Sequence, residues 1–171
     1  MYTDNIITER LVLKSMTLDD AEIAWSFWGD YEMGKYLCDP YYKDANELRE
    51  LISDIDQWEN EYPFIAYDKN TGDAIATCSI GVEGGPNQWG FGYCVRKDLW
   101  GQGYATEIVK ALINFAYSLG IRDFQGTVAK ENSASRRVME KCGMHLDHES
   151  SFKKKGTDIV YASCIYKMHL D

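Results

Sequence analysis

The chain has 171 residues, enough for one domain, and its 45% hydrophobic and 13% aromatic content excludes a disordered chain. Its formal net charge of −9 argues against nucleic acid as a partner, and no apolar run is long enough to predict a membrane span. The first residues lack the basic and apolar regions of a secretion signal, so we expect a cytoplasmic protein with no membrane partner. The five cysteines are odd in number and lack metal-ligand spacing, so we expect reduced thiols and no metal site.

The charge is unevenly distributed along the chain. Residues 1–100 hold 19 acidic and 8 basic residues, a net charge of −11, whereas residues 101–171 hold 8 acidic and 10 basic residues, a net charge of +2. A cationic substrate near the first part and an anionic ligand near the second would fit this asymmetry. The alternative is that the surface acids only keep the protein soluble.

The first half of the chain predicts a strand, two helices and a hairpin. Residues 9–16, ERLVLKSM, alternate as a strand, and residues 17–30 begin with Thr17 as N-cap before apolar residues at helical spacing. Residues 44–60 carry a second helical stripe. Residues 63–82 form two strand-like runs around an Asn-Thr-Gly turn, which is typical of a β-hairpin.

The second half predicts strands at 89–95, 123–129, 144–152 and 157–168, with helices at 104–120 and 132–142. The unit from Trp89 to Ala129 is strand–helix–strand, a crossover that joins parallel strands. The other connections are typical of antiparallel pairing. We therefore expect a mixed α/β fold in one domain over residues 1–171. Residues 152–156, FKKKG, are interpreted as a solvent-exposed hairpin tip.

Residues 99–107, LWGQGYATE, place Gly101 and Gly103 immediately before a helix. The unpaired N–H groups at a helix N-terminus can surround a pyrophosphate when no bulky side chain lies in front of them. A Walker-type loop is excluded because it needs Gly-Lys-Ser or Gly-Lys-Thr at its end, whereas Gly103 is followed by Tyr104, Ala105 and Thr106. A dinucleotide fingerprint is excluded because Thr106 replaces its third glycine. Taken alone, the loop is either a phosphate cradle or a tight turn.

The segments GYCVRKDLWGQGYATE and ENSASRRVMEKCGM, in this order and spacing, resemble the Gcn5-related N-acetyltransferase (GNAT) superfamily. The phrases ERLVLKSMTLDDA, WGQGYATE and NSASRRVMEKCGM resemble in particular its RimJ/RimL-like branch, which acetylates ribosomal-protein N-termini. The resemblance implies a seven-stranded, largely antiparallel sheet splayed between two central parallel strands, with about four helices. It also implies transfer of the acetyl group of acetyl-CoA to a primary amine by direct attack.

The resemblance also implies which residues bind acetyl-CoA. Backbone N–H groups of the loop would hold the pyrophosphate, and the pantetheine arm would pair with the edge of the preceding strand. The implied cofactor-binding residues are Cys94, Val95, Trp100, Gly101, Gln102, Gly103, Tyr104, Ala105, Thr106, Asn132, Ser135 and Lys141, with Arg136 or Arg137 as further phosphate ligands. Asn132 is also a good N-cap, and the basic residues and Glu107 have a purely structural interpretation, as solvated or dipole-complementing side chains.

The residues expected to donate and accept protons depart from the family pattern. Many relatives have a tyrosine that protonates the departing thiolate, but Met139 stands at that position, so Ser135 and Asn132 are the predicted catalytic residues. The branch often has a glutamate where this chain has Gly90, which leaves the base open among Glu83, Glu149 and acids of the first helices.

The missing glutamate bears on the acceptor. A lysine amine with a pKa of about 10.4 is roughly one-thousandth neutral near pH 7.4, whereas an α-amine with a pKa of about 7.8 is roughly one-third neutral. We therefore favour an α-amine, such as a peptide N-terminus, or another weakly basic amine as acceptor, a preference that a carboxylate from Glu83, Glu149 or the first helices could reverse. Polyamines, aminoglycosides and metabolites remain alternatives, as does a non-catalytic acyl-CoA-binding module. A monomer and a homodimer are both compatible with the sequence.

Overall fold

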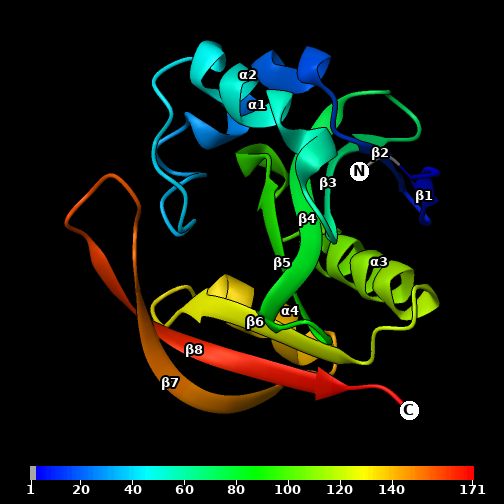
Figure 1. Cartoon of the computed structure of the whole chain (residues 1–171), viewed down its shortest axis with the longest axis vertical. Helices are drawn as coiled ribbons and strands as arrows, with labels where there is room; N and C mark the ends of the chain where they lie inside the picture. The colour runs from blue at the N-terminus through cyan, green and yellow to red at the C-terminus, as the bar shows by residue number, and fades with distance from the viewer. Residues whose placement is uncertain (1–2) are drawn as a thin grey trace.

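A computed structural model describes residues 3–171 (Figure 1). Within this range one sheet has eight strands in the order β1-β2-β3-β4-β5-β6-β8-β7. The strands are β1 (Ile6–Ile7), β2 (Leu11–Ser15), β3 (Glu61–Asp68), β4 (Ala74–Gly85), β5 (Gln88–Val95), β6 (Asp123–Ala129), β7 (His145–Lys153) and β8 (Val160–His169). The helices are α1 (Ala21–Trp28), α2 (Ala45–Ser53), α3 (Tyr104–Ser118) and α4 (Ser133–Lys141), with 3-10 turns at Leu18–Asp20, Ile55–Gln57 and Lys97–Leu99.

The predicted mixed fold is confirmed, but the predicted count of seven strands is wrong. The eighth strand, β1, is two residues long and pairs with β2 through Ile6 opposite Leu13 and Ile7 opposite Val12. Two residues are too few to show an alternating pattern, so periodicity does not reveal this strand.

Local capping sets where the first two helices begin. Thr17 donates its N–H and hydroxyl to the Asp20 carboxylate, which closes a 3-10 turn before α1 starts at Ala21. Asp44 accepts the N–H groups of Asn46 and Glu47 and so caps α2. The second helix is shorter than residues 44–60 because α2 ends at Ser53 and a 3-10 turn follows.

The sheet opens between its two central strands. Within the described residues β5 and β6 are the one parallel pair, joined by Gln88 with Asp123, Trp89 with Phe124 and Gly90 with Gln125. The pairing ends at Gly90 and Gln125, and beyond them the two strands diverge visibly (Figure 1). The predicted splay is therefore confirmed, and it leaves one edge of β5 without a strand partner among the described residues.

The helices cover opposite faces of the sheet. On β3, Phe64 and Ala66 belong to the core beneath α3, whereas Ile65 packs with residues of α1 and α2. This division follows from the alternation of side chains along a strand. On β5 the same alternation buries Trp89 on the α3 side, while the Cys94 side chain reaches the carbonyl of Met33, which follows α1. Among the described helices none is long and apolar enough to cross a membrane.

Candidate active site

A cavity of about 440 Å³ lies at the opening between β5 and β6. It is bounded by the start of α3, by α4 and by the segment that connects α1 to α2. The predicted residues that line it are Cys94, Val95, Trp100, Gly101, Gly103, Tyr104, Ala105, Thr106, Asn132, Ser135 and Lys141. Gln102 does not line it. The structure thus brings two segments about thirty residues apart in sequence to one hollow.

The glycine loop has a backbone that other residues adopt poorly. Gly101 and Gly103 have φ angles of 76° and 83°, in the left-handed region. A Cβ added at Gly101 would meet no atom within 4 Å, so its surface is open to a ligand. The Trp100 indole donates to the carbonyl of Val95 at 2.8 Å, which fixes the loop against the end of β5. The N–H groups at the start of α3 therefore face the cavity without side chains in front of them.

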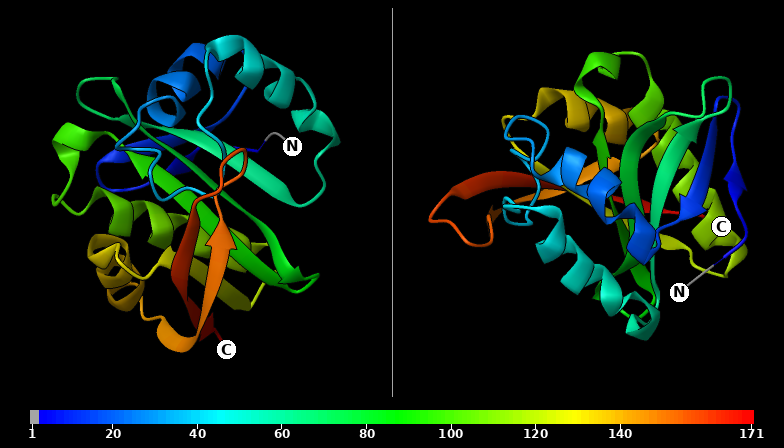
Figure 2. Two further views of the ribbon diagram at one scale, coloured as in Figure 1. Left: turned by 90° about the vertical axis from the view of Figure 1, so that its left-hand side faces the viewer. Right: turned by 90° about the horizontal axis from the view of Figure 1, so that it is seen from above.

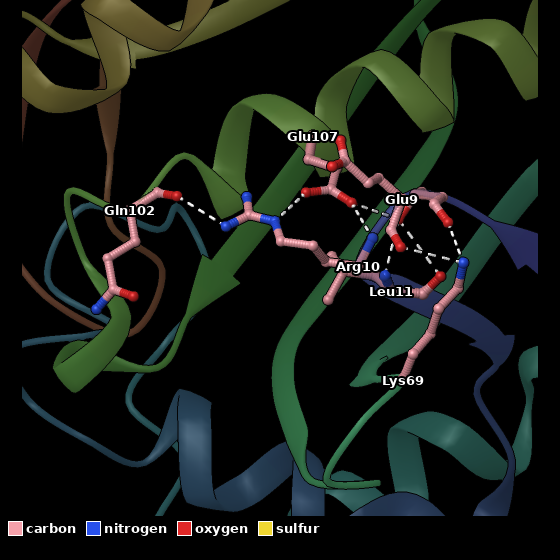
Figure 3. Close-up of polar contacts among 7 residues, drawn as sticks. Glu9, Arg10, Leu11, Lys69, Gln102 and Glu107 are labelled. Carbon is pink, nitrogen blue, oxygen red and sulfur yellow. Dashed lines mark hydrogen bonds and ion pairs between the residues drawn. The ribbon is translucent and has the colours of Figure 1, made fainter.

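A partly buried ion pair supports this loop from behind (Figure 3). Glu107 accepts hydrogen bonds from the Thr8 hydroxyl at 2.6 Å, the Arg10 N–H at 2.8 Å and Arg10 Nε at 2.6 Å. Arg10 Nη1 donates to the carbonyl of Gln102 at 3.0 Å, and its guanidinium lies 3.9 Å from the centre of the Tyr104 ring. Glu107 therefore does more than complement the helix dipole: it joins the N-terminal strands to the loop.

This pair gives a pH-dependent stability prediction. Burial alone raises the pKa of Glu107, but hydrogen bonds from Thr8 and Arg10 outweigh it and hold that pKa below its ordinary value. The resulting stabilisation is present above the unfolded pKa and is lost as pH falls through the folded one. Glu107→Gln is expected to lower the free energy of unfolding by about 2 kcal/mol at pH 7, a gap that narrows below about pH 4.

Urea denaturation at both pH values measures this effect. The matched control is Glu22→Gln, because Glu22 pairs with Arg49 on the surface with 63% of its side chain exposed. That change is expected to leave stability nearly unaltered. Equal stability of Glu107→Gln and the unaltered protein at pH 7 would contradict the assignment.

Ser135 lies at the centre of a small polar group in the cavity wall. Asn132 accepts the Ser135 N–H at 3.2 Å, so it caps α4, and its amide also donates to Ser135 Oγ at 3.2 Å. Tyr93 donates its hydroxyl to the same Oγ at 2.8 Å. Burial raises the pKa of Tyr93 to about 12, which keeps the phenol protonated at neutral pH. Because Oγ accepts two hydrogen bonds, its own proton is available to a ligand in the cavity.

Met139, at the position where relatives carry tyrosine, belongs to the core. It is 1% exposed, and its sulfur fills the space that a side chain at Gly126 of β6 would need. A thioether has no proton to donate, so Met139 cannot replace the tyrosine as an acid.

Tyr93 is a part of the site that the sequence did not predict. Along β5, Trp89, Phe91 and Tyr93 alternate onto the side of the sheet that faces α3 and α4. This alternation is the sequence signal that could have placed the Tyr93 hydroxyl beside the first turn of α4. The pairing with Ser135 joins residues 42 positions apart, and the sequence alone does not show it.

Glu83 occupies the space that Gly90 leaves open. The two residues lie on the neighbouring strands β4 and β5, and a side chain at Gly90 would collide with the Glu83 carboxylate. Glu83 Oε1 accepts hydrogen bonds from the Thr127 hydroxyl at 3.0 Å and from Gln125 Nε2 at 3.3 Å. Glu83 does not itself line the cavity, but Thr127 does, so the Thr127 hydroxyl connects the carboxylate to the cavity wall.

The other acids that the sequence left open are placed differently. Glu149 pairs with Lys130 at 2.7 Å and is 61% exposed, and it does not line the cavity. Glu61 lies beside Glu83, over Gly81, where a side chain would meet its carboxylate. Burial, followed by the charge of Glu83, raises the pKa of Glu61. Glu83 is therefore the candidate whose hydrogen bonds connect it to the cavity.

The remaining walls of the cavity come from basic residues and from the segment after α1. Arg137 and Lys141 line it, whereas Arg136 turns away and donates to the Tyr166 hydroxyl at 3.3 Å. Residues between α1 and α2 also line it, namely Glu32, Met33, Tyr36 and Leu37. The walls of the cavity therefore include two cationic side chains and the segment between α1 and α2, besides the glycine loop.

A sheet opened between two central parallel strands, with a bare glycine loop at the adjoining helix start, defines a protein of the N-acetyltransferase type. The model of the acetyltransferase (GNAT) domain matches residues 10–145. The chain therefore belongs to the GNAT family and is an acetyl-CoA-dependent acetyltransferase.

Sequence and structure comparisons agree with this assignment. The chain is 29% identical over 162 residues to the uncharacterized N-acetyltransferase p20 of Bacillus licheniformis, covering 86% of this chain and 89% of that one. The ribosomal-protein-S5-alanine acetyltransferase of Vibrio fischeri has a similar structure, with a TM-score of 0.82 at 13% identity over 99% and 98% of the two chains. The spermidine N-acetyltransferase of Vibrio cholerae, in complex with CoA and spermine, also has a similar structure, with a TM-score of 0.81 at 16% identity. The match covers 94% of this chain and 95% of that one.

Proposed function

We propose that the protein acetylates a primary amine by direct attack on acetyl-CoA in a ternary complex, with a peptide N-terminal α-amine as the acceptor. The observation that carries this proposal is the cavity itself. It joins the glycine loop, the Ser135 hydroxyl and, through Thr127, the Glu83 carboxylate. A phosphate site, a proton donor and a proton acceptor are therefore arranged around one hollow.

The residues present fit acetyl-CoA as co-substrate. The N–H groups from Gly101 to Thr106 would bind the pyrophosphate at the positive end of α3, and Arg137 and Lys141 add positive charge beside it. The edge of β5 around Cys94 and Val95 has no strand partner on the β6 side, so the amides of the pantetheine arm would pair there. Asn132 and Ser135 would then lie near the thioester.

Glu83 and Ser135 would handle the two protons of the reaction. As the amine attacks the thioester carbonyl, Glu83 would accept a proton from the nitrogen. Ser135 would donate its proton to the departing thiolate while its Oγ takes a proton from the Tyr93 hydroxyl, which solvent would restore, and Asn132 would hold Oγ in place. Such proton transfers contribute roughly 10²-fold to 10⁴-fold each to the rate.

The acceptor follows from how easily an amine is made neutral. An α-amine with a pKa of about 7.8 is roughly one-third neutral near pH 7.4, whereas making a lysine amine neutral costs roughly 4 kcal/mol before the attack begins. The structural similarity to the ribosomal-protein-S5-alanine acetyltransferase supports a RimJ/RimL-like acceptor. The two neighbouring carboxylates, Glu61 and Glu83, favour a second candidate, a polyamine, as does the similarity to the spermidine enzyme.

The free cysteines fit a reducing cytoplasm.

An amine panel tests the proposed function. Thiol release from acetyl-CoA is followed with a peptide that has a free N-terminus, an N-blocked peptide with lysine, spermidine and an aminoglycoside. We expect the highest kcat/KM with the free N-terminus. A higher value with spermidine would favour the polyamine acceptor instead. Tight acetyl-CoA binding without turnover on any amine would indicate a binding module.

Ser135→Ala tests the proton donor. We expect kcat to fall about 10²-fold, because the thiolate would leave without general-acid assistance. Steady-state rates on the preferred amine give kcat, and calorimetry gives the acetyl-CoA Kd. Ser133→Ala, an exposed serine in the same first turn of α4, is the matched control and should retain activity. An unchanged kcat in Ser135→Ala with intact acetyl-CoA binding would remove Ser135 from the mechanism.

A further inference from the structure

Lys154 is buried although it lies at the tip of the β7–β8 hairpin. The interpretation of residues 152–156 as a solvent-exposed tip is wrong for this residue, which is 0% exposed. Its neighbours Lys153 and Lys155 have 59% and 69% of their side chains exposed, as expected for a hairpin tip. A buried ammonium is costly unless its donors find partners, so the burial needs an explanation.

The explanation is a cage of backbone carbonyls. Lys154 Nζ donates to the carbonyls of Gly34 at 2.8 Å, Leu37 at 2.9 Å and Asp39 at 2.7 Å. The ammonium also lies 4.2 Å from the centre of the Tyr41 ring, a cation–π contact. All three of its N–H donors are thus used within a single segment of the chain.

That segment, residues 30–43, connects α1 to α2 and forms turns rather than helix or strand along its described length. Figure 2 shows the tip of the β7–β8 hairpin lying against it. The Lys155 N–H also donates to the carbonyl of Cys38 at 2.9 Å, and the rings of Tyr36 and Tyr161 meet edge to face at 5.5 Å. The conformation of residues 30–43 therefore depends on contacts with the hairpin, more than one hundred positions away.

The same segment forms one wall of the cavity. Met33, Tyr36 and Leu37 line it, and the Met33 carbonyl accepts from Cys94 Sγ at 3.6 Å. Two of the three carbonyls that Lys154 holds belong to Leu37 itself and to Gly34, which is next to Met33 in sequence. A shift of the carbonyl cage would move the wall with it.

We infer that Lys154 is a positioning residue that fixes the acceptor-side wall of the cavity by holding three carbonyls of residues 30–43. The inference rests on the proposed function, because it takes the amine acceptor to bind against this wall. Lys154 touches neither substrate. It acts through the segment that it holds, so its loss should impair acceptor binding and leave acetyl-CoA binding intact.

Lys154→Met tests this inference, since methionine fills similar space without donors. We expect the acceptor KM to rise about tenfold or more, because small displacements of a binding wall are costly. The acetyl-CoA Kd, measured by calorimetry, should change less than about twofold. Hydrogen exchange should accelerate in residues 30–43 and stay unchanged in α3. Lys153→Met, on the exposed side of the same hairpin, is the matched control and should behave as the unaltered protein.

Lys154→Arg covers the case in which the methionine variant does not fold. It keeps the charge but not the geometry of an ammonium, so we expect an intermediate acceptor KM with an unchanged acetyl-CoA Kd. An unaltered acceptor KM in either variant, or an acetyl-CoA Kd that rises in parallel, would overturn the inference. Failure of the unaltered protein to acetylate any amine would instead overturn the proposed function, while the exchange of residues 30–43 would still test the cage.

Discussion

Replacing Glu83 by glutamine is expected to lower kcat about 10³-fold, equivalent to about 4 kcal/mol of transition-state stabilisation. The amide keeps the shape of the side chain and can still accept the Thr127 hydroxyl, which lies 3.0 Å from Oε1. It cannot accept a proton from the attacking amine. The loss should therefore appear in kcat, with the acetyl-CoA Kd changed less than about twofold.

Steady-state rates on the preferred amine and calorimetry with acetyl-CoA measure these two quantities. Glu149→Gln is the matched control, because Glu149 is an exposed carboxylate whose partner is Lys130. We expect its kcat to equal that of the unaltered protein. If Glu83→Gln turned over at the normal rate, the base would have to be sought elsewhere on the acceptor side, beginning with Glu61.

Gly103→Val is expected to raise the acetyl-CoA Kd at least about 100-fold, a loss of about 3 kcal/mol. Gly103 has a φ of 83°, a conformation that costs a residue with a Cβ about 1–2 kcal/mol and a β-branched residue more. The first atom that an added Cβ would meet is Arg10 Nη2 at 3.5 Å, so the new side chain would also press on the ion pair that supports the loop. Both effects displace the loop from the conformation in which its N–H groups can bind a pyrophosphate.

Calorimetry with acetyl-CoA gives the Kd, and thermal unfolding shows how much of the change is general destabilisation. Gly72→Val is the matched control, since Gly72 has a φ of 76° in the β3–β4 turn with no atom within 4 Å of an added Cβ. That variant carries a similar backbone cost away from the cavity, so its acetyl-CoA Kd should be normal. Normal binding by Gly103→Val would make the loop an ordinary turn.

The fold was predictable where local patterns decide it. The strand over 123–129 and the helix that follows Gly103 lie where their alternation and spacing predict, because both are long and strongly periodic. The predicted splay rested on the family resemblance rather than on periodicity. The two-residue strand β1 was missed because pairing with β2, and no pattern of its own, makes it a strand.

The site residues that belong to local motifs could be predicted, but the contacts between residues distant in sequence could not. The predicted loop and Asn132 with Ser135 do line one cavity. Arg10, Tyr93 and Lys154 were not predicted as parts of the site because each acts on residues distant in sequence, such as Gln102, Ser135 and Gly34. No sequence pattern around a lysine in a turn shows that its ammonium will bind three distant carbonyls. Residues 152–156 were therefore interpreted as exposed to solvent.

The arrangement of Glu83 over Gly90 has a consequence for how relatives are compared. In an antiparallel pair, the same volume above the sheet can be filled by a side chain from either strand. A sequence alignment records only that the acidic group is lost at residue 90. A comparison by occupied volume records that a carboxylate from the adjacent strand lies over Gly90. Active and inactive members of such a family are therefore better distinguished by superposing their structures than by comparing aligned sequence positions.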